Sequence, residues 1–211
     1  MTIDHIAWIF PLNNGPLPYF GHVFGRITAP IMWFFVSEGC YYTKDWKGYF
    51  LRVLVFAIIS HFAYCCYEGI PLWYQTSVMW PLALSVILIK LDNSSNLPDH
   101  VKILAVIMLI LCSIPSDWGV LALLMPAVLY KCRHSFKLQA VAIIISSVAA
   151  VFLTNAPLPY RIIQLFAVLS IPILANYNNE RGDGNKWFFY IYYPLHLVVL
   201  GVYKRILISL I

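Results

Sequence analysis

The segment from Trp187 to Gly201 reads WFFYIYYPLHLVVLG. Almost every residue in it is aromatic or aliphatic, yet it contains Pro194 and the ionisable His196. Together with the apolar residues that follow it, this run is long enough to form a helix that crosses lipid. An ionisable side chain inside such a helix is costly and points to a functional site by default. The segment therefore predicts a membrane protein with a polar interior.

The composition of the whole chain extends this prediction. Its 211 residues are 61% hydrophobic and 11% charged, with a mean hydropathy of +0.77, whereas a soluble domain has about 25% charged residues. At about 20 residues per crossing, there is room for about eight or nine spans. We predict an all-α polytopic membrane protein, a single domain over residues 1–211, with its helices around a central polar cavity.

Apolar runs between polar breaks give nine candidate segments. They cover residues 1–11, 23–41, 46–66, 77–91, 100–114, 118–131, 137–154, 159–176 and 187–208. The first is shorter than a full crossing, so we expect either a partial span or a start site further upstream.

The net charge of +5 is explained by loop charge rather than by nucleic-acid binding, because Lys and Arg gather in the cytoplasmic loops of membrane proteins. Ten of the 14 basic residues fall on one side of the predicted spans: Lys44, Lys47, Arg52, Lys90, Lys102, Lys131, Arg133, Lys137, Arg181 and Lys186. The rule predicts a cytoplasmic N-terminus. No Cys or His spacing fits a metal site, so no metal is expected.

Five ionisable residues have similar predicted depths, in the outer half of the bilayer: Asp4, His5, Arg26, His61 and His196. Each has a structural alternative, such as a helix–helix hydrogen bond or an anchor at the headgroups. As a group, they predict one aqueous pocket. Glu38 is expected deeper, towards the cytoplasm.

Histidine takes protons readily at neutral pH, and a carboxylate can orient its ring. Asp4 and His5 point about 100° apart on a helix, so Asp4 can serve a different histidine. Arginine can stabilise an oxyanion. The sequence lacks a nucleophile elbow or a Gly-rich phosphate loop, so acyl transfer by direct attack, with histidine as the base, fits these residues best.

Several short stretches resemble the TraX family, named for a conjugation protein that N-acetylates pilin. In chain order they are Ile3–Ala7, Gly25–Pro30, Ser37–Gly39, Ile59–Tyr64, Trp118–Val120 and Tyr192–Leu197. TraX proteins are usually grouped with the transmembrane acyltransferases, which include the acyltransferase-3 proteins. The resemblance implies an acyl transfer from a coenzyme A thioester to an acceptor in or across the membrane.

Carried over to this chain, the resemblance implies His5, Asp4, His196 and Arg26 as catalytic residues. We assign acceptor binding to Glu38, His61, Tyr64 and Tyr193. Acetyl-CoA, the expected donor, would approach from the cytoplasm, with its phosphates near the basic loop residues Lys44, Lys47, Arg52, Lys131 and Arg133. The expected acceptor is an amine or hydroxyl group of a pilin N-terminus or a surface glycan.

Two other classes of protein remain open. A transporter or flippase for a small polar substrate also needs buried His, Arg and carboxylate groups, although the sequence shows none of the inverted repeats common in such proteins. A structural membrane subunit would use the same residues only to join helices.

Overall fold

The computed structural model describes residues 1–10, 16–94, 97–180 and 186–210. Over these residues the regular structure is helical, apart from one isolated bridge between Thr76 and Ser116. This confirms the all-α prediction. Arg181, one of the predicted basic loop residues, lies outside the described part of the chain.

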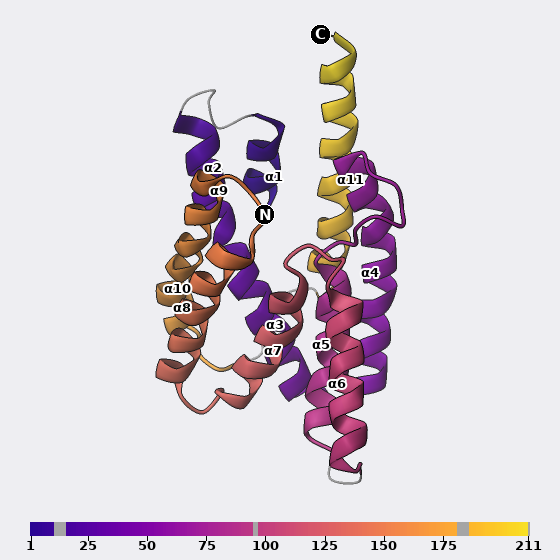
Figure 1. The fold of residues 1–211 in the computed structure, drawn as a ribbon, viewed down its shortest axis with the longest axis vertical. Coiled ribbons are helices and arrows are strands. Elements are labelled where there is room, and N and C mark those ends of the chain that lie inside the picture. Colours follow the sequence, from indigo (N-terminus) through magenta and orange to yellow (C-terminus); the bar gives the residue numbers. More distant parts are fainter. Residues whose placement is uncertain (11–15, 95–96, 181–185, 211) are drawn as a thin grey trace.

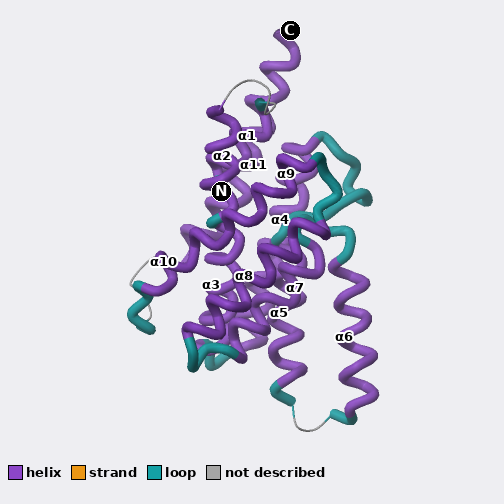
Figure 2. The backbone as a smooth tube through the Cα atoms, turned by 60° about the vertical axis from the view of Figure 1, so that its left-hand side comes forward, coloured by secondary structure: helices purple, strands orange, loops and turns teal. Residues whose placement is uncertain are grey.

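The helices of the first half are α1 (Thr2–Ile9), α2 (Pro16–Arg26), α3 (Thr28–Tyr42), α4 (Trp46–Glu68) and α5 (Met79–Asp92). Those of the second half are α6 (Asp99–Ser113), α7 (Gly119–Lys131), α8 (Phe136–Leu153), α9 (Leu158–Ile163), the 3₁₀ segment η2 (Gln164–Leu169), α10 (Ser170–Ala175) and α11 (Lys186–Leu210). In Figure 1, α3 and α7 lie between a group containing α1, α2 and α8–α10 and a group containing α4–α6 and α11. The α5–α6 hairpin projects from one end, and the C-terminal part of α11 extends from the opposite end (Figures 1 and 2).

The boundaries of α4 follow from local sequence signals. Helix α4 begins after Asp45, whose carboxylate accepts a hydrogen bond from the Gly48 backbone N–H at 2.9 Å, and it ends at Gly69 with a φ of 75°. An aspartate cap and a left-handed glycine are typical of the two ends of a helix. The predicted segment 46–66 is therefore correct to within a turn.

The predicted segment 23–41 is wrong in one respect. The chain forms two helices there, α2 and α3, which meet at Ile27. Pro30 explains the break, because its ring would clash with the carbonyl group of Arg26 four residues earlier in a continuous helix. Arg26 is consequently the last residue of α2 and not part of the first turn of a span.

Three helical segments are long and apolar enough to cross a membrane, judged by length and composition: Trp46–Glu68, Phe136–Leu153 and Leu158–Ala175. The protein is thus a polytopic helical membrane protein; the number of eight or nine crossings stays a prediction.

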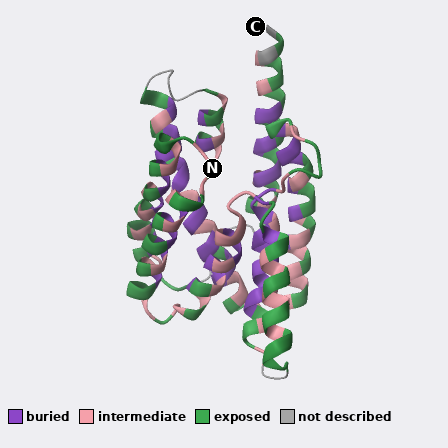
Figure 3. Ribbon diagram, in the orientation of Figure 1, coloured by how far each residue is buried: buried purple, intermediate pink, exposed green. Residues whose placement is uncertain are grey.

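Large apolar side chains cover the outward helix faces. On α6, the side chains of Ile103, Leu104 and Met108 are 55–60% exposed, and exposed residues also line the outward faces of α8 and α10 (Figure 3). Apolar patches of this extent are unfavourable in water and suit lipid.

Candidate functional site

Two small residues of α2 bring α1 close to it. Gly21 and Gly25 are four residues apart, and both face α1. A Cβ atom at Gly21 would lie 2.7 Å from the Ala7 Cβ, and one at Gly25 would overlap the Asp4 side chain. Small residues at this spacing allow helices to approach closely in membranes. Because of this approach, the Asp4 carboxylate reaches the polar residues of α2.

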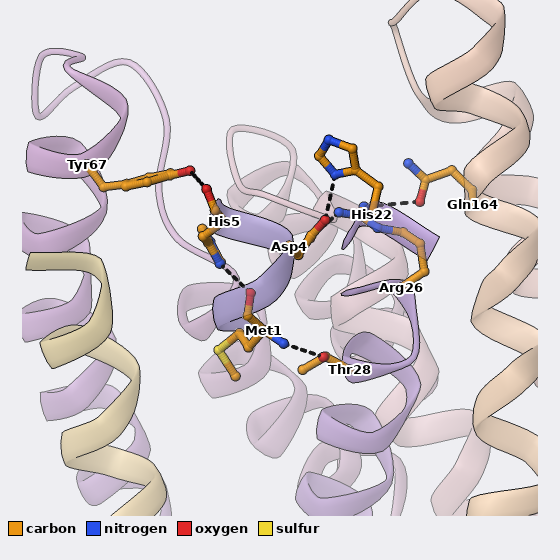
Figure 4. A network of polar contacts seen from close by, with 8 residues as sticks. All are labelled: Met1, Asp4, His5, His22, Arg26, Thr28, Tyr67 and Gln164. Atoms are coloured by element: carbon orange, nitrogen blue, oxygen red, sulfur yellow. Dashed lines mark hydrogen bonds and ion pairs between the residues drawn. The ribbon is translucent and has the colours of Figure 1, made fainter. Parts of the chain in front are cut away.

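Asp4 is the centre of a buried polar network (Figure 4). Its Oδ1 atom lies 2.8 Å from Nδ1 of His22, and its Oδ2 atom accepts a hydrogen bond from Nη2 of Arg26. Arg26 also donates through Nη1 to Oε1 of Gln164 at 3.3 Å. Asp4, Arg26 and His22 are at most 9% exposed, so the charge of each ionised partner is compensated inside the protein.

The ring of His5 is oriented by its own helix. Its Nδ1 atom lies 3.0 Å from the Met1 carbonyl oxygen. A carbonyl oxygen only accepts hydrogen bonds, so Nδ1 donates and Nε2 has a free lone pair. Tyr67 donates from its hydroxyl group to the His5 backbone carbonyl at 2.6 Å (Figure 4). His5 is thus held as a neutral tautomer able to accept a proton through Nε2.

His196 lies beside His5, although 191 positions separate them in the sequence. Their ring centroids are 5.1 Å apart, at an interplanar angle of 73°. His196 Nδ1 lies 3.0 Å from the Tyr192 carbonyl oxygen, which fixes the same tautomer as in His5. Its buried Nε2 atom has no hydrogen-bond partner within the described residues.

A cavity of about 230 Å³ connects these groups. Its wall brings together five of the residues singled out in the sequence: Asp4, His5, Arg26, Tyr64 and Tyr193. They come from α1, α2, α4 and α11. The expected meeting of ionisable groups from distant helices is therefore present, with His196 directly behind His5.

Two carboxylates in the cavity wall were not anticipated from the sequence. Glu68 is the last residue of α4, and Asp117 lies in the loop between α6 and α7. Burial raises the pKa of Asp117 to about 6, although the nearby Arg26 lowers it. A charged residue next to Trp118 and Gly119, between two apolar runs, was the available signal in the sequence. His22 was also given no role, although it is the histidine that Asp4 contacts.

Glu38 and His61 do not line this cavity. Glu38 lies ten residues beyond Thr28 along α3, about 15 Å further at the rise of a helix, and Arg133 binds its carboxylate with Nε and Nη2 at 2.9 and 3.2 Å. His61 packs against Phe62 and lies 3.7 Å from the Cys65 thiol of its own helix. The predicted place of His61 in the pocket is therefore wrong, whereas the separation of Glu38 from His5 agrees with the deeper position expected for it.

The basic loops meet at the opposite end of α3, around a second cavity of about 570 Å³. Its charged lining residues are Lys44, Arg52, Glu38 and Glu180. The aromatic side chains in its wall are Phe35, Tyr42, Tyr49, Tyr177 and Tyr190. The other predicted basic residues lie outside its lining: Lys47 is exposed, Lys131 pairs with Asp92 at 2.9 Å and Arg133 pairs with Glu38.

One face of α3 borders both cavities. Thr28 and Met32 line the first, and Phe35 and Gly39 line the second. These positions are four, three and four residues apart, so they follow one face of a helix. The two cavities thus succeed one another along α3.

These features define a class: a polytopic all-α membrane protein whose helices enclose a small charged cavity with a histidine, His5, in its wall. A family model described as TraX protein matches residues 1–204, and the chain belongs to this family. The chain is also similar to a probable fimbrial assembly protein, FimC of serogroup H1, from Dichelobacter nodosus. The two are 26% identical over 226 residues, which span 98% of this chain and 92% of the relative. No solved structure matches the chain.

Proposed function

We propose that this protein is a membrane acyltransferase that moves an acetyl group from acetyl-CoA to an amine or hydroxyl acceptor, with His5 as the general base. One observation carries the proposal: His5 lines the cavity, and its bond to the Met1 carbonyl leaves Nε2 free to accept a proton. Membership of the TraX family and similarity to a fimbrial assembly protein support a bacterial surface protein, such as a pilin N-terminus, as the acceptor; a surface glycan is the other candidate.

In this mechanism the acceptor enters the cavity beside His5. As its nitrogen or oxygen attacks the thioester carbonyl carbon, Nε2 of His5 takes the proton. The tetrahedral intermediate collapses, the carbon–sulfur bond breaks, and the imidazolium returns the proton to the leaving thiolate. The products are the acetylated acceptor and coenzyme A.

Arg26 is suited to stabilise the oxyanion of the intermediate. Its two terminal nitrogens bind Asp4 and Gln164, while its buried Nε–H has no hydrogen-bond partner among the described residues. A fixed cation with a free donor favours charge that develops in the transition state. Asp4 holds this guanidinium in place and is a positioning residue.

His196 has a different role in this proposal. Because its Nδ1–H is bound to the Tyr192 carbonyl, its Nε2 atom accepts and does not donate in the neutral ring. It is therefore poorly suited to bind an oxyanion. Its contact with the His5 ring makes it a positioning residue for the base.

The donor would occupy the second cavity. Lys44 and Arg52 provide positive charge for the phosphates of acetyl-CoA, and the aromatic side chains provide stacking surfaces. From there the thioester would follow the shared face of α3 to His5. We place this end of the protein at the cytoplasmic side of the inner membrane, where the positive-inside rule puts basic loops.

The test is a transfer assay with the purified full chain in detergent, radiolabelled acetyl-CoA and candidate acceptors. His5→Gln should lower the rate about 100-fold or more, the usual contribution of a general base. His100→Gln is the matched control, because His100 is exposed at the start of α6. If His5→Gln transfers at a near wild-type rate, His5 is not the general base. If wild type transfers no acetyl group to any acceptor, the proposed acyltransferase activity is wrong.

A further inference from the structure

The loop that carries Asp117 is held in place by a second loop. Thr76, from the segment between α4 and α5, donates its backbone N–H to the Pro115 carbonyl at 2.8 Å and accepts from the Asp117 N–H at 2.9 Å. The hydroxyl groups of Thr76 and Ser116 are 2.8 Å apart. Val78, Asp117 and Trp118 of these two segments form part of the wall of the central cavity.

The backbone directly after Asp117 is strained. Trp118 has a φ of 60° and Gly119 a φ of 41°. For a bulky residue such as Trp118 this conformation is unfavourable and persists only where the surroundings impose it, often at functional sites. Here the Trp118 ring lies 5.4 Å from the Trp33 ring and also 5.4 Å from the Arg26 guanidinium carbon. These contacts fix the ring and, with it, the position of Asp117.

The basic groups of the cavity do not neutralise the Asp117 carboxylate, so this carboxylate is available to bind a ligand. Arg26 already binds the Asp4 carboxylate and the Gln164 amide. The ionisable groups around Asp117 are Arg26 of α2, Asp4 of α1, Glu68 and Tyr64 of α4 and Tyr193 of α11. Among the described residues, Arg26 is the one basic side chain in this set, and it is matched by Asp4. The cavity wall also contains the Met1 ammonium group, which donates to the Thr28 hydroxyl, and the His5 ring. The Asp117 carboxylate accepts a hydrogen bond from the Trp118 backbone but forms no ion pair within the described part of the chain, so a ligand that donates a hydrogen bond can bind it.

We propose that Asp117 is a further substrate-contacting residue, whose carboxylate accepts a hydrogen bond from the N–H or O–H group of the acceptor and holds that acceptor for attack beside His5. This inference rests on the proposed acyl transfer. Because burial raises the Asp117 pKa to about 6, the carboxylate form dominates above that pH, and acceptor binding should strengthen as the pH rises through 6.

The experiment compares Asp117→Asn with wild type, with Asp92→Asn as the matched control, because Asp92 pairs with Lys131 away from the cavity. In the transfer assay, Asp117→Asn should raise the acceptor KM about tenfold or more, the usual effect of losing a hydrogen bond to a charged group. The KM for acetyl-CoA should stay within about twofold. The rise in acceptor affinity around pH 6 should disappear in this variant. Asp117→Glu, which keeps the carboxyl group, should recover part of the affinity.

A binding measurement separates this inference from the proposed function. Ethanolamine, which has both an amine and a hydroxyl group, is titrated into the full chain and followed by saturation-transfer NMR at pH 8. Binding lost in Asp117→Asn and kept in Asp92→Asn supports the inference, even if wild type transfers no acetyl group. An unchanged acceptor KM, or ethanolamine binding that is equal in wild type and Asp117→Asn or absent from both, would overturn it. Circular dichroism of each variant shows that it is folded.

Discussion

The Asp4 carboxylate binds the ring of His22, 2.8 Å from Nδ1, while the neighbouring His5 ring binds the Met1 carbonyl. The two adjacent residues thus have separate roles. Asp4 binds His22 and Arg26 of α2 and holds the guanidinium of Arg26 in place, whereas His5 presents a free ring nitrogen to the cavity.

Asp4→Asn should destabilise the protein by about 3 kcal/mol, because it leaves the buried Arg26 charge without its carboxylate. Asp92→Asn is the matched control. Its pair with Lys131 is exposed, and such pairs contribute about 1 kcal/mol or less. Thermal unfolding in detergent provides the measurement, and equal effects of the two variants would contradict the structural role of Asp4.

Gly25→Ala should reduce transfer while the bundle stays folded. The added methyl group would overlap the Asp4 side chain, so α1 must move away from α2 and take His5 with it. Phe24→Ala is the control, because Phe24 precedes Gly25 on the same turn of α2 and is 59% exposed. Rates are compared after circular dichroism has established equal helix content, and an unchanged rate for Gly25→Ala would mean that the close approach is dispensable.

Arg52→Ala should raise the KM for acetyl-CoA about tenfold, since charge-assisted hydrogen bonds to phosphate are stronger than neutral ones. Lys44→Ala should act in the same direction. Lys47→Ala should have no effect, because Lys47 is exposed and lies outside the lining of the second cavity. A KM that responds equally to Lys47→Ala would indicate general attraction by the basic surface and not a defined site.

Asp117→Asn should make the protein more stable at pH 8 than wild type. The folded-state pKa of about 6 is above the ordinary value of 3.8, so the folded state binds this proton more tightly than the unfolded state does. Stability therefore falls as the pH rises from about 4 to 6. The neutral amide avoids this loss, and its melting temperature should exceed that of wild type by about 6 °C at pH 8, with little difference at pH 4. A difference that is independent of pH would assign the effect to something other than ionisation.

Sequence patterns predicted the helices well because length and apolarity determine which segments enter lipid. The segments 118–131 and 187–208 agree closely with α7 and α11. The break at Ile27 also has a local cause, Pro30, whose effect on the preceding turn can be predicted from the sequence.

The candidate site was only partly predictable, since it depends on how helices rotate and pack. Asp4, His5, Arg26 and His196 were found because ionisable residues stand out in apolar runs. Asp117 was missed because it lies in a loop, and only the pairing of that loop with Thr76 brings it into the cavity. The pairing of Glu38 with Arg133 was not predicted either, because Arg133 comes from a loop whose position the sequence does not specify.

The close contact between α4 and α11 has a consequence for the orientation of His5. A Cβ atom at Gly201 would lie 3.0 Å from the Tyr67 Cα, so the backbones of the two helices approach each other closely there. Tyr67 of α4 and His196 of α11 each contact the His5 ring, with ring centroids 5.1 Å apart. A side chain at position 201 that pushed these helices apart would therefore also change the two rings between which His5 lies.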